Sequence, residues 1–439
     1  MSTDVDLTGI VTTDIAAVTR GRFIATNTFE KTIATGVGWL QANLSLTPFN
    51  VIAHPNPWGS SGDLRLLPDP NARYRTSKTG SQTPFDMVPG NLVELDGSPW
   101  SCCTRTMLAD ALAELKAKTG LTLAAAFEHE FKLLDAGLPK EHVMSFAGLR
   151  RADGFASQVM AALEEAGLNP EVIISEYGED QFEVTNAPSD GLAAADRAVV
   201  LREIVREIAR TRGWKASFSP KTSPSSVGNG VHIHFSLVGT DGQPATYDPS
   251  GPAGLSRAAG SFCAGVLRHL PAITALTASS VSSYYRLKPH NWSSSYTWLG
   301  DKDREATLRI CPIVTFGGKD PAKSFNIEYR AADATSNPYL ALAAIVRAGL
   351  EGLIAGLPCP QVHSGDPEEL SEEQRAEKGL RRLPETLAGA LDALKSDPVV
   401  TSWFSEVFLE TFVGMKAFEM ASLNGLDEEA ICASYRAAY

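Results

Sequence analysis

The chain has 439 residues, enough for two or three domains, and its composition of 44% hydrophobic and 21% charged residues is ordinary for a globular protein. A formal net charge of −12 argues against nucleic acid or an anionic membrane surface as the main partner. No apolar run is long enough to cross a membrane and no signal peptide is visible, so we expect a cytoplasmic protein. The six cysteines lack CxxC spacing, which indicates reduced thiols rather than disulfides or a zinc site.

The first hundred residues are expected to form a small β-rich unit. Strands are predicted at residues 11–15 and 22–24 around an Arg20-Gly21 turn, within 59–69, and from 91 to an Asp-Gly turn at 96–97. Residues 74–90, rich in Thr, Ser, Gly and Pro, are predicted to be an exposed loop. Helical periodicity begins after residue 104, so we place a domain boundary near 103 and divide the chain into 1–103 and 104–439.

The larger part is predicted to mix strands and helices. Helices are expected at 107–118, 154–166, 190–212, 254–269, 338–353 and over most of 387–439. Strands are expected at 121–134, 171–175, 181–185, 215–218, 231–237 and 326–330. The acidic stretch 365–377 is predicted to be a solvated loop or a loosely held helix.

The stretch Phe-Glu-His-Glu-Phe at residues 127–131 continues an apolar strand and is the most informative in the chain. Alternation sends Glu128 and Glu130 to one face of the strand, with Phe127 and Phe131 on the other. Adjacent carboxylates repel, and burying them is costly unless cations compensate; oxygen ligands suit Mg²⁺ and Mn²⁺. The alternative is that both side chains point to solvent from an edge strand.

Three further stretches repeat this arrangement of charge on half-apolar strands. A tight turn lies between Glu176 and Glu183, and a shared strand face carries His232 and His234. Further along the chain, similar alternation applies to Glu328 with Arg330 and, less regularly, to Arg304 with Arg309. Individually, the histidines could be a hydrogen-bonded structural pair and the arginines surface ion pairs of little energetic value. Together they indicate a site where metals and arginines hold a phosphoryl group.

These motifs resemble those of the glutamine synthetase family, in the expected order, from about residue 11 to 430. The most specific are Gly-x-Gly-x-His-x-His-x-Ser-Leu at 228–237 and Glu-x-Arg-x-x-Asp-x-x-x-Asn-Pro-Tyr-Leu at 328–340. The resemblance implies an α+β fold with an N-terminal β-grasp domain (1–103) and a catalytic domain (104–439) built on a curved antiparallel sheet. It also implies a ring-shaped homo-oligomer in which the N-terminal domain of one subunit closes its neighbour's site.

The resemblance also implies roles for individual residues. It assigns one Mg²⁺ or Mn²⁺ to Glu130, Glu176 and Glu183, and a second to Glu128, His232 and Glu328. It assigns the γ-phosphoryl of ATP to His234, Arg304 and Arg309, with Lys323 near the phosphates and Glu171 and Ser236 on the nucleotide side. It assigns glutamate to Gly228, Arg286 and Arg330, with Arg304 and Arg330 also in the catalytic set, and the role of general base to Asp63.

One departure from the family bears on the substrate. Family members that use ammonia carry a glutamate in the flap after the Arg-Leu-x-Pro segment, and here that position falls on Trp292. Loss of the acid weakens binding of ammonium, whereas an indole offers a flat apolar wall. Trp292 could instead be a packing residue in a differently folded flap. A second departure, Val227 in the glycine loop, affects contact with the α-amino group of glutamate.

We therefore expect an ATP-dependent ligase that phosphorylates the γ-carboxylate of glutamate and transfers the acyl group to an organic amine, with aniline-like amines favoured. The family includes γ-glutamylanilide and γ-glutamylpolyamine synthetases, and an acidic protein attracts polyamines in general. The same motifs are compatible with a γ-glutamyl-alkylamine synthetase, an ammonia-using glutamine synthetase or an inactive structural paralogue. All six metal-ligand positions carry Glu or His, which argues against the inactive paralogue.

Overall fold

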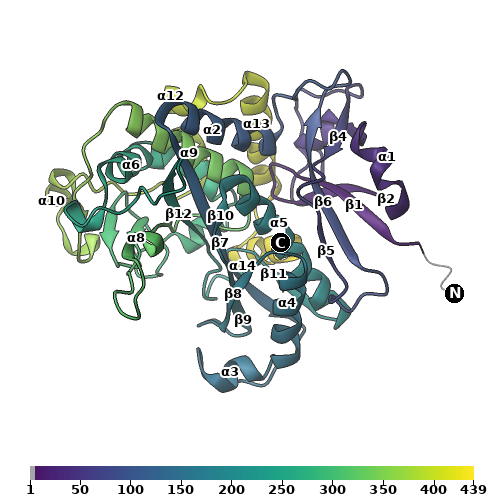
Figure 1. Cartoon of the computed structure of the whole chain (residues 1–439), viewed down its shortest axis with the longest axis horizontal. Helices are drawn as coiled ribbons and strands as arrows, with labels where there is room; N and C mark the ends of the chain where they lie inside the picture. The colour runs from purple at the N-terminus through teal and green to yellow at the C-terminus, as the bar shows by residue number, and fades with distance from the viewer. Residues whose placement is uncertain (1–4) are drawn as a thin grey trace.

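A computed structural model describes residues 5–439 and contains two β-sheets with helices packed around them (Figure 1). The smaller sheet belongs to the N-terminal part, on the right in Figure 1, and the larger sheet to the rest of the chain. The predicted α+β class is confirmed. Within residues 5–439, no helix is both long enough and apolar enough to span a membrane.

The N-terminal sheet has six strands in the order β2-β1-β6-β4-β3, with β5 beside β6. Its strands are β1 (Leu7–Thr13), β2 (Thr19–Ala25), β3 (Val37–Leu40), β4 (Asp63–Pro68), β5 (Tyr74–Thr76) and β6 (Phe85–Val93). The prediction of an exposed loop at 74–90 is wrong, because β5 and β6 lie there. Met87 and Val88 are buried, and the buried carboxylate of Asp86 accepts hydrogen bonds from Arg73 and Thr8. The turn expected at Arg20-Gly21 is also misplaced, since both residues lie inside β2.

The larger sheet has ten strands and is mainly antiparallel. The order is β16-β13-β14-β15-β12-β7-β9-β8, with β10 and β11 also pairing with β7. Its strands are β7 (Leu121–Leu134), β8 (Pro170–Ser175), β9 (Gln181–Asn186), β10 (Ser189–Asp190), β11 (Lys215–Ser217), β12 (Val231–Gly239), β13 (Leu299–Asp301), β14 (Leu308–Ile310), β15 (Ile327–Tyr329) and β16 (Val362–His363). The long β7 pairs with four of the other strands, β9, β10, β11 and β12.

Burial alternates along β7 as its sequence predicts. Phe127 and Phe131 are buried against the helical side, whereas Glu128 and Glu130 are half-buried on the opposite face. Phe131 packs against Phe182 of β9 and Phe218, which form a buried aromatic layer under the sheet. This apolar face fixes the orientation of β7, since a shift by one residue would exchange its two faces.

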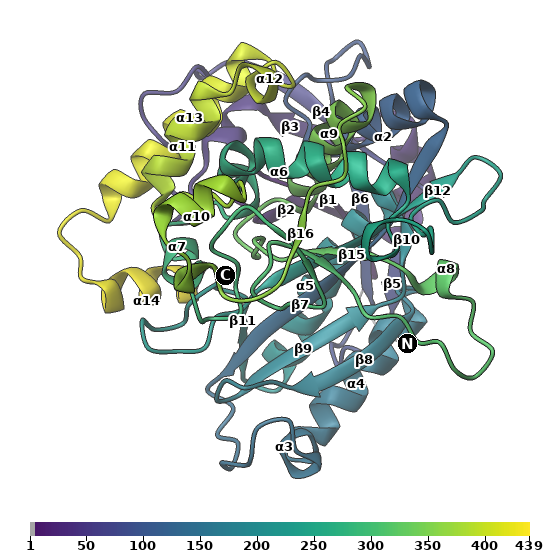
Figure 2. The same cartoon turned by 90° about the vertical axis from the view of Figure 1, so that its left-hand side faces the viewer.

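Helices and short 3₁₀ turns, joined by irregular segments, make up the rest of the described chain (Figure 2). The α-helices are α1 (Phe29–Ile33), α2 (Thr104–Thr119), α3 (Phe146–Arg150), α4 (Asp153–Glu165), α5 (Gly191–Thr211), α6 (Arg257–Thr277), α7 (Ser283–Arg286), α8 (Pro321–Ser324), α9 (Pro338–Ile354), α10 (Glu372–Glu377), α11 (Leu387–Ser396), α12 (Pro398–Thr401), α13 (Glu406–Ser422) and α14 (Glu428–Ala438). The 3₁₀ turns are η1 (Thr26–Thr28), η2 (Gln41–Ser45), η3 (Pro252–Gly254) and η4 (Pro367–Glu369). Helices α2 and α6 both pack on α9, and α5 packs against β7.

Helix α6 continues past the predicted end at residue 269 and contains Pro271. A proline inside a helix leaves the carbonyl four residues earlier without its usual donor. Here the Arg381 guanidinium donates to the carbonyls of Leu267 and Arg268, at 3.4 and 3.3 Å. A distant side chain thus satisfies the carbonyl that Pro271 frees, which no local pattern could predict.

Buried polar contacts join the two parts of the chain. The Arg105 guanidinium donates to Asp196 of α5 and, at 2.8 Å, to Asp69 after β4. The amide of Asn337, at the start of α9, donates to the carbonyls of Thr13 and Asp14. These contacts fix the N-terminal sheet against the helices behind the larger sheet.

Candidate active site

The register of three strands brings the predicted acids and histidines together. Across the β7–β12 ladder, His232 lies opposite Glu128, and across the β7–β9 ladder Glu183 lies opposite Glu130. The β12–β15 pair then sets Glu328 opposite His234. Because side chains alternate in direction along each strand, these residues all face the same side of the sheet.

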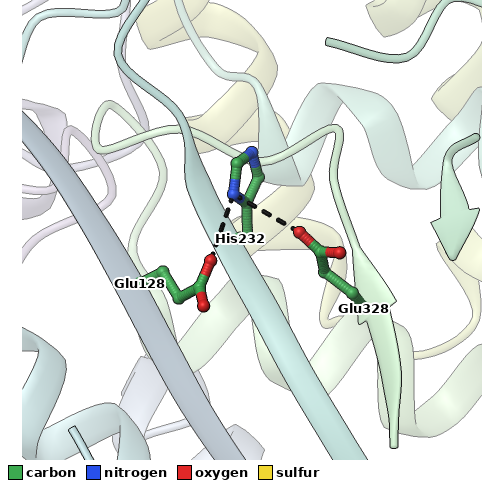
Figure 3. A group of neighbouring side chains, drawn as sticks. All are labelled: Glu128, His232 and Glu328. Atoms are coloured by element: carbon green, nitrogen blue, oxygen red, sulfur yellow. Dashed lines mark hydrogen bonds and ion pairs between the residues drawn. The ribbon is translucent and has the colours of Figure 1, made fainter. Parts of the chain in front are cut away.

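Figure 3 shows Glu128, His232 and Glu328 converging from β7, β12 and β15. The Nδ1 atom of His232 lies 3.4 Å from a carboxylate oxygen of Glu128 and 3.4 Å from one of Glu328. Their ligand atoms lie within 4.8 Å of one another, a spacing that suits a metal ion. A donor set of two carboxylates and one imidazole fits Mg²⁺ or Mn²⁺.

A second possible ligand group contains Glu130, Glu183 and His232. Glu176 lines the same cavity, at the end of the β8–β9 turn. The Glu176 carboxylate does not belong to this group of closely spaced ligand atoms. The predicted trio of Glu130, Glu176 and Glu183 therefore shares one cavity, but its three carboxylates are not all within the short spacing of that group. The Glu130 carboxylate also accepts hydrogen bonds from the Gly230 N–H at 2.9 Å and from Gln181.

The electrostatics of the cluster show an excess of negative charge. Burial, with Glu176 nearby, raises the pKa of Glu130 to about 7. Burial and the neighbouring carboxylates of Glu128 and Glu130 raise the pKa of Glu183 to about 9. Burial opposes ionisation of Glu328 as well, but His232 and Arg330 lower the pKa of this carboxyl to about 2. The acids nearest β9 therefore lack enough cationic partners within the chain and fit a cation site.

Four arginines line the cavity, and three of them, Arg304, Arg309 and Arg330, are linked to Glu328 or to one another. Arg309 donates to Glu328 at 2.8 Å, and Arg330 also forms an ion pair with Glu328. The third, Arg304, is exposed to the cavity, and its carbonyl accepts a hydrogen bond from the Arg330 Nε at 2.9 Å. The guanidinium groups of Arg309 and Arg330 are thus held by Glu328, whereas that of Arg304 is exposed.

Arg286 enters the cavity floor from α7. It is 3% exposed, and its guanidinium donates to the carbonyls of Ala332 and Ala331 at 2.7 and 3.0 Å. A Cβ atom at Gly228 would lie only 2.6 Å from the Arg286 side chain, so glycine is required there for this packing. Gly228 and Arg286, both assigned to glutamate by the resemblance, therefore lie next to each other.

The cavity has a volume of about 840 Å³, and two chemically different sets of side chains line it. The carboxylates, histidine and arginines are one set. The apolar members of the lining, which we call the apolar wall, are Met144, Ile174, Tyr177, Val227 and Trp292. The Tyr177 and Trp292 rings meet edge to face, with centroids 5.1 Å apart. Trp292 is 51% exposed, so it lies at the cavity surface rather than in the core.

The segment that carries Trp292 has an unusual backbone. His290, Trp292 and Ser294 have φ values of 61°, 51° and 59°. This left-handed conformation costs about 1–2 kcal/mol per non-glycine residue. We call residues 290–294 the flap. Its backbone makes hydrogen bonds to Glu305 and Arg330, which compensate for the strain.

Several predicted site residues do not line this cavity. Near β15, His234 Nε2 lies 3.1 Å from Glu128 and its Nδ1 lies 2.8 Å from Asn326 Oδ1, while Ser236 donates to the carbonyl of Phe325. Lys323 is exposed on α8, and Glu171 is exposed on β8. Asp63 is exposed at the start of β4 in the N-terminal sheet and is absent from the lining.

Four residues near the cavity carry polar or apolar contacts that the sequence reasoning missed. Tyr177 and Gln181 lie between Glu176 and Glu183, so the tight turn predicted there was the signal that could have identified them. Met144 and Glu305 lie in irregular segments, where no periodicity indicates which way a side chain points.

Comparison with known proteins places the chain among relatives over nearly its whole length. Residues 2–100 match the glutamine synthetase N-terminal domain, and residues 101–435 match the glutamine synthetase catalytic domain. A gamma-glutamylpolyamine synthetase of Streptomyces coelicolor is 34% identical, with 97% of this chain and 92% of the relative covered. A glutamine synthetase of Pyrococcus furiosus is 30% identical, with 96% and 91% covered. A crystal structure described as a novel glutamine synthase homolog matches with a TM-score of 0.91, 43% identity and complete coverage of both chains.

Proposed function

Since the chain belongs to the glutamine synthetase family and is therefore an ATP-dependent ligase that forms carbon–nitrogen bonds, we propose that its amine substrate is organic rather than ammonia. The proposed reaction phosphorylates the γ-carboxylate of glutamate, and the amine then displaces phosphate from γ-glutamyl phosphate to give a γ-glutamylamide. Aromatic amines such as aniline are the favoured class.

Enzymes of this family use ATP and divalent metal ions, and the carboxylate–histidine cluster fits such ions. We assign one Mg²⁺ or Mn²⁺ to Glu130, Glu176 and Glu183, and a second to Glu128, His232 and Glu328. When bound, the ions neutralise charge on the phosphoryl oxygens. The raised pKa values of Glu130 and Glu183 support this assignment, because a cation would hold both carboxyls ionised.

We assign the γ-phosphoryl group of ATP to Arg304, Arg309 and His234. Arg304 supports this role because its guanidinium faces the cavity without a carboxylate partner among the described residues. Stabilising charge on the transferring phosphoryl is the main requirement of such a reaction. Ser236, Lys323 and Glu171 are kept as candidates for the nucleotide side.

Gly228, Arg286 and Arg330 are the proposed glutamate site. Arg286 is held by backbone carbonyls alone, so its charge is available to a substrate carboxylate. An acyl phosphate in this cavity needs protection from hydrolysis, which closure of the site to bulk water would provide.

The apolar wall is the observation that carries the choice of amine. Where ammonia-using relatives need an acid, Trp292 presents an indole beside Tyr177, and Val227 and Met144 line the same cavity. The acids that line the cavity within residues 5–439 are Glu128, Glu130, Glu176, Glu183 and Glu328, all of them in the proposed metal sets. A neutral arylamine needs contact area rather than an anionic cage, which this wall supplies.

Asp63 is the proposed general base, and its position supports a role in a neighbouring subunit of a ring-shaped oligomer. It is exposed on the N-terminal sheet, outside the cavity of its own chain. An amine that attacks the acyl phosphate must lose a proton, and a carboxylate from the adjoining subunit could accept it.

A γ-glutamylpolyamine synthetase is the second candidate, favoured by the likeness to the Streptomyces coelicolor enzyme of that name. A panel of ammonia, ethanolamine, putrescine and aniline, each with glutamate, ATP and Mg²⁺, separates the candidates by phosphate release and amide formation. We expect aniline to give the highest kcat/KM. A preference for putrescine would support the second candidate, and a preference for ammonia would overturn the proposal.

A further inference from the structure

One acid near the cavity is neither in the metal cluster nor free in solvent. The half-buried carboxylate of Glu305 accepts a hydrogen bond from the backbone N–H of Trp292 at 2.7 Å. The backbone of His290 faces the same carboxylate, so two residues of the flap lie against it. A carboxylate that accepts backbone N–H groups holds a loop more strongly than a neutral acceptor does.

Glu305 is itself fixed in place. Its N–H donates to Asp303 Oδ1 at 3.0 Å, and its carbonyl accepts from the indole of Trp298, which is 2% exposed. The flap is held from the other side by Arg330, whose guanidinium donates to the carbonyl of Trp292 at 3.0 Å. Both polar atoms of the Trp292 peptide backbone are thus held by charged side chains from outside the flap.

We propose that Glu305 is a positioning residue for amine selection: its carboxylate holds Trp292 in the left-handed conformation that sets the indole against Tyr177 in the apolar wall. The inference rests on the proposed function, because it assumes that the apolar wall receives the amine. It adds a residue that touches no substrate and acts through the backbone of Trp292.

The geometry favours this role over a direct one. Glu305 does not line the cavity, so its carboxylate is not placed to bind an amine. The left-handed conformation of Trp292 is unfavourable for a side chain of this size and persists only where contacts hold it. Without the Glu305 carboxylate, the Trp292 N–H would lose its acceptor and the flap would relax toward ordinary conformations.

The test is a double-mutant cycle on Glu305→Ala and Trp292→Ala, with Glu305→Gln and Glu369→Ala as further variants. The measured quantities are kcat/KM and KM for aniline and for ammonia, and KM for glutamate and ATP. Glu369 is an exposed acid without a side-chain partner among the described residues, so Glu369→Ala controls for loss of one negative charge. We expect Glu305→Ala to reduce the aniline-to-ammonia preference about tenfold, as loss of a charged hydrogen bond allows.

Because Glu305 is inferred to act through Trp292, the double variant should show the preference of Trp292→Ala alone. The KM values for glutamate and ATP should stay within about twofold of wild type, and Glu305→Gln, which keeps one acceptor oxygen, should be intermediate. Additive losses in the double variant, or equal rises in KM for glutamate and amine, would overturn the inference. If Glu305→Ala does not fold, a wild-type aniline-to-ammonia preference in both Glu305→Gln and Trp292→Ala would also overturn the inference.

The wild-type panel keeps the two proposals separate. A wild-type preference for ammonia would overturn the proposed function. The double-mutant cycle, run with the organic amine that gives the highest kcat/KM, would still report whether Glu305 acts through Trp292.

Discussion

The acids of the cavity differ in how their charge is balanced. Glu328 lies between Arg309 and Arg330, so its negative charge has partners within the chain. Among residues 5–439, the ion-pair partners of Glu128 are the imidazoles of His232 and His234, and no guanidinium pairs with it. Removing Glu128 therefore takes away a ligand without breaking a guanidinium pair that the fold needs.

We expect Glu128→Ala to lower phosphate release by at least about 100-fold, the scale of losing one group that stabilises the transition state. The Tm should stay near that of wild type, because Glu128 is half-buried at the cavity surface. Glu164→Ala, at an exposed position of α4, is the matched control and should retain activity. Retained activity in Glu128→Ala would remove Glu128 from the metal set.

Trp292→Glu tests whether the side chain at position 292 selects the amine. A carboxylate at this position restores an anion for ammonium, so we expect the ammonia-to-aniline preference to rise by about 10-fold, the effect of about 1.4 kcal/mol. The amine panel measures this change directly. If the amine profile of Trp292→Glu matches wild type, the apolar wall does not select the amine.

Among the elements, β7 and β12 show which features of the site could be predicted from the sequence. Alternation along one strand is a local property, so the shared face of Glu128 and Glu130, and that of His232 and His234, could be predicted. The pairing of His232 with Glu128 depends on the register between strands about 100 residues apart in sequence, which no local pattern specifies. The family resemblance supplied that information in part.

The flap shows where sequence reasoning ended. Trp292 could be singled out from the family motif, but its partner Glu305 lies in an irregular segment and meets it only through the backbone. The prediction of an exposed loop at 74–90, where β5 and β6 lie, was wrong for a related reason. Turn-forming residues dominate the composition of this stretch, but burial of Met87 and Val88 in the sheet determines its structure.

A second contact of the flap predicts a pH dependence. The hydrogen bond from His290 to Asp366 at 2.6 Å raises the pKa of His290, and Glu305 and Glu368 add to the rise. A histidine whose pKa is raised in the folded state stabilises it below the unfolded pKa of about 6.5, and the effect is lost as pH rises through the folded value. Hydrogen exchange across 288–294, corrected for intrinsic rates, should therefore be faster at about pH 8.5 than at about pH 6.

Asp366→Asn provides the control for that measurement. It removes the anionic partner of His290 and keeps a side chain of nearly the same size. The corrected exchange of the flap should then depend little on pH, and a pH dependence equal to that of wild type would show that another group controls the flap.

At the scale of the whole molecule, the exposed position of Asp63 leads to a test of shared sites. If Asp63 serves a neighbouring subunit, then Asp63→Asn and Glu128→Ala damage different halves of each site. Mixed oligomers assembled from equal amounts of the two variants should contain intact sites, about a quarter of the total for random assembly of a closed ring. Amide formation should therefore rise on mixing, above the low rate expected of each variant alone.

The measurement is amide formation after the two variants are unfolded, mixed and refolded, with each variant treated alone as the control. No recovery in mixtures that are shown to be oligomeric would place Asp63 outside the neighbour's site. Asp63→Asn alone should slow amide formation more than acyl phosphate formation, because the base acts only in the second step.

The two-residue repeat of β7 also determines which changes in chain length the protein tolerates. A single deletion between Phe127 and Glu130 would bring phenyl rings into the cavity and carboxylates into the aromatic layer around Phe131. A deletion in the exposed turn at 240–242 shifts no such pattern. In a library of one-residue deletions, survivors should therefore be frequent at that turn and missing along this strand, even where individual substitutions there are accepted.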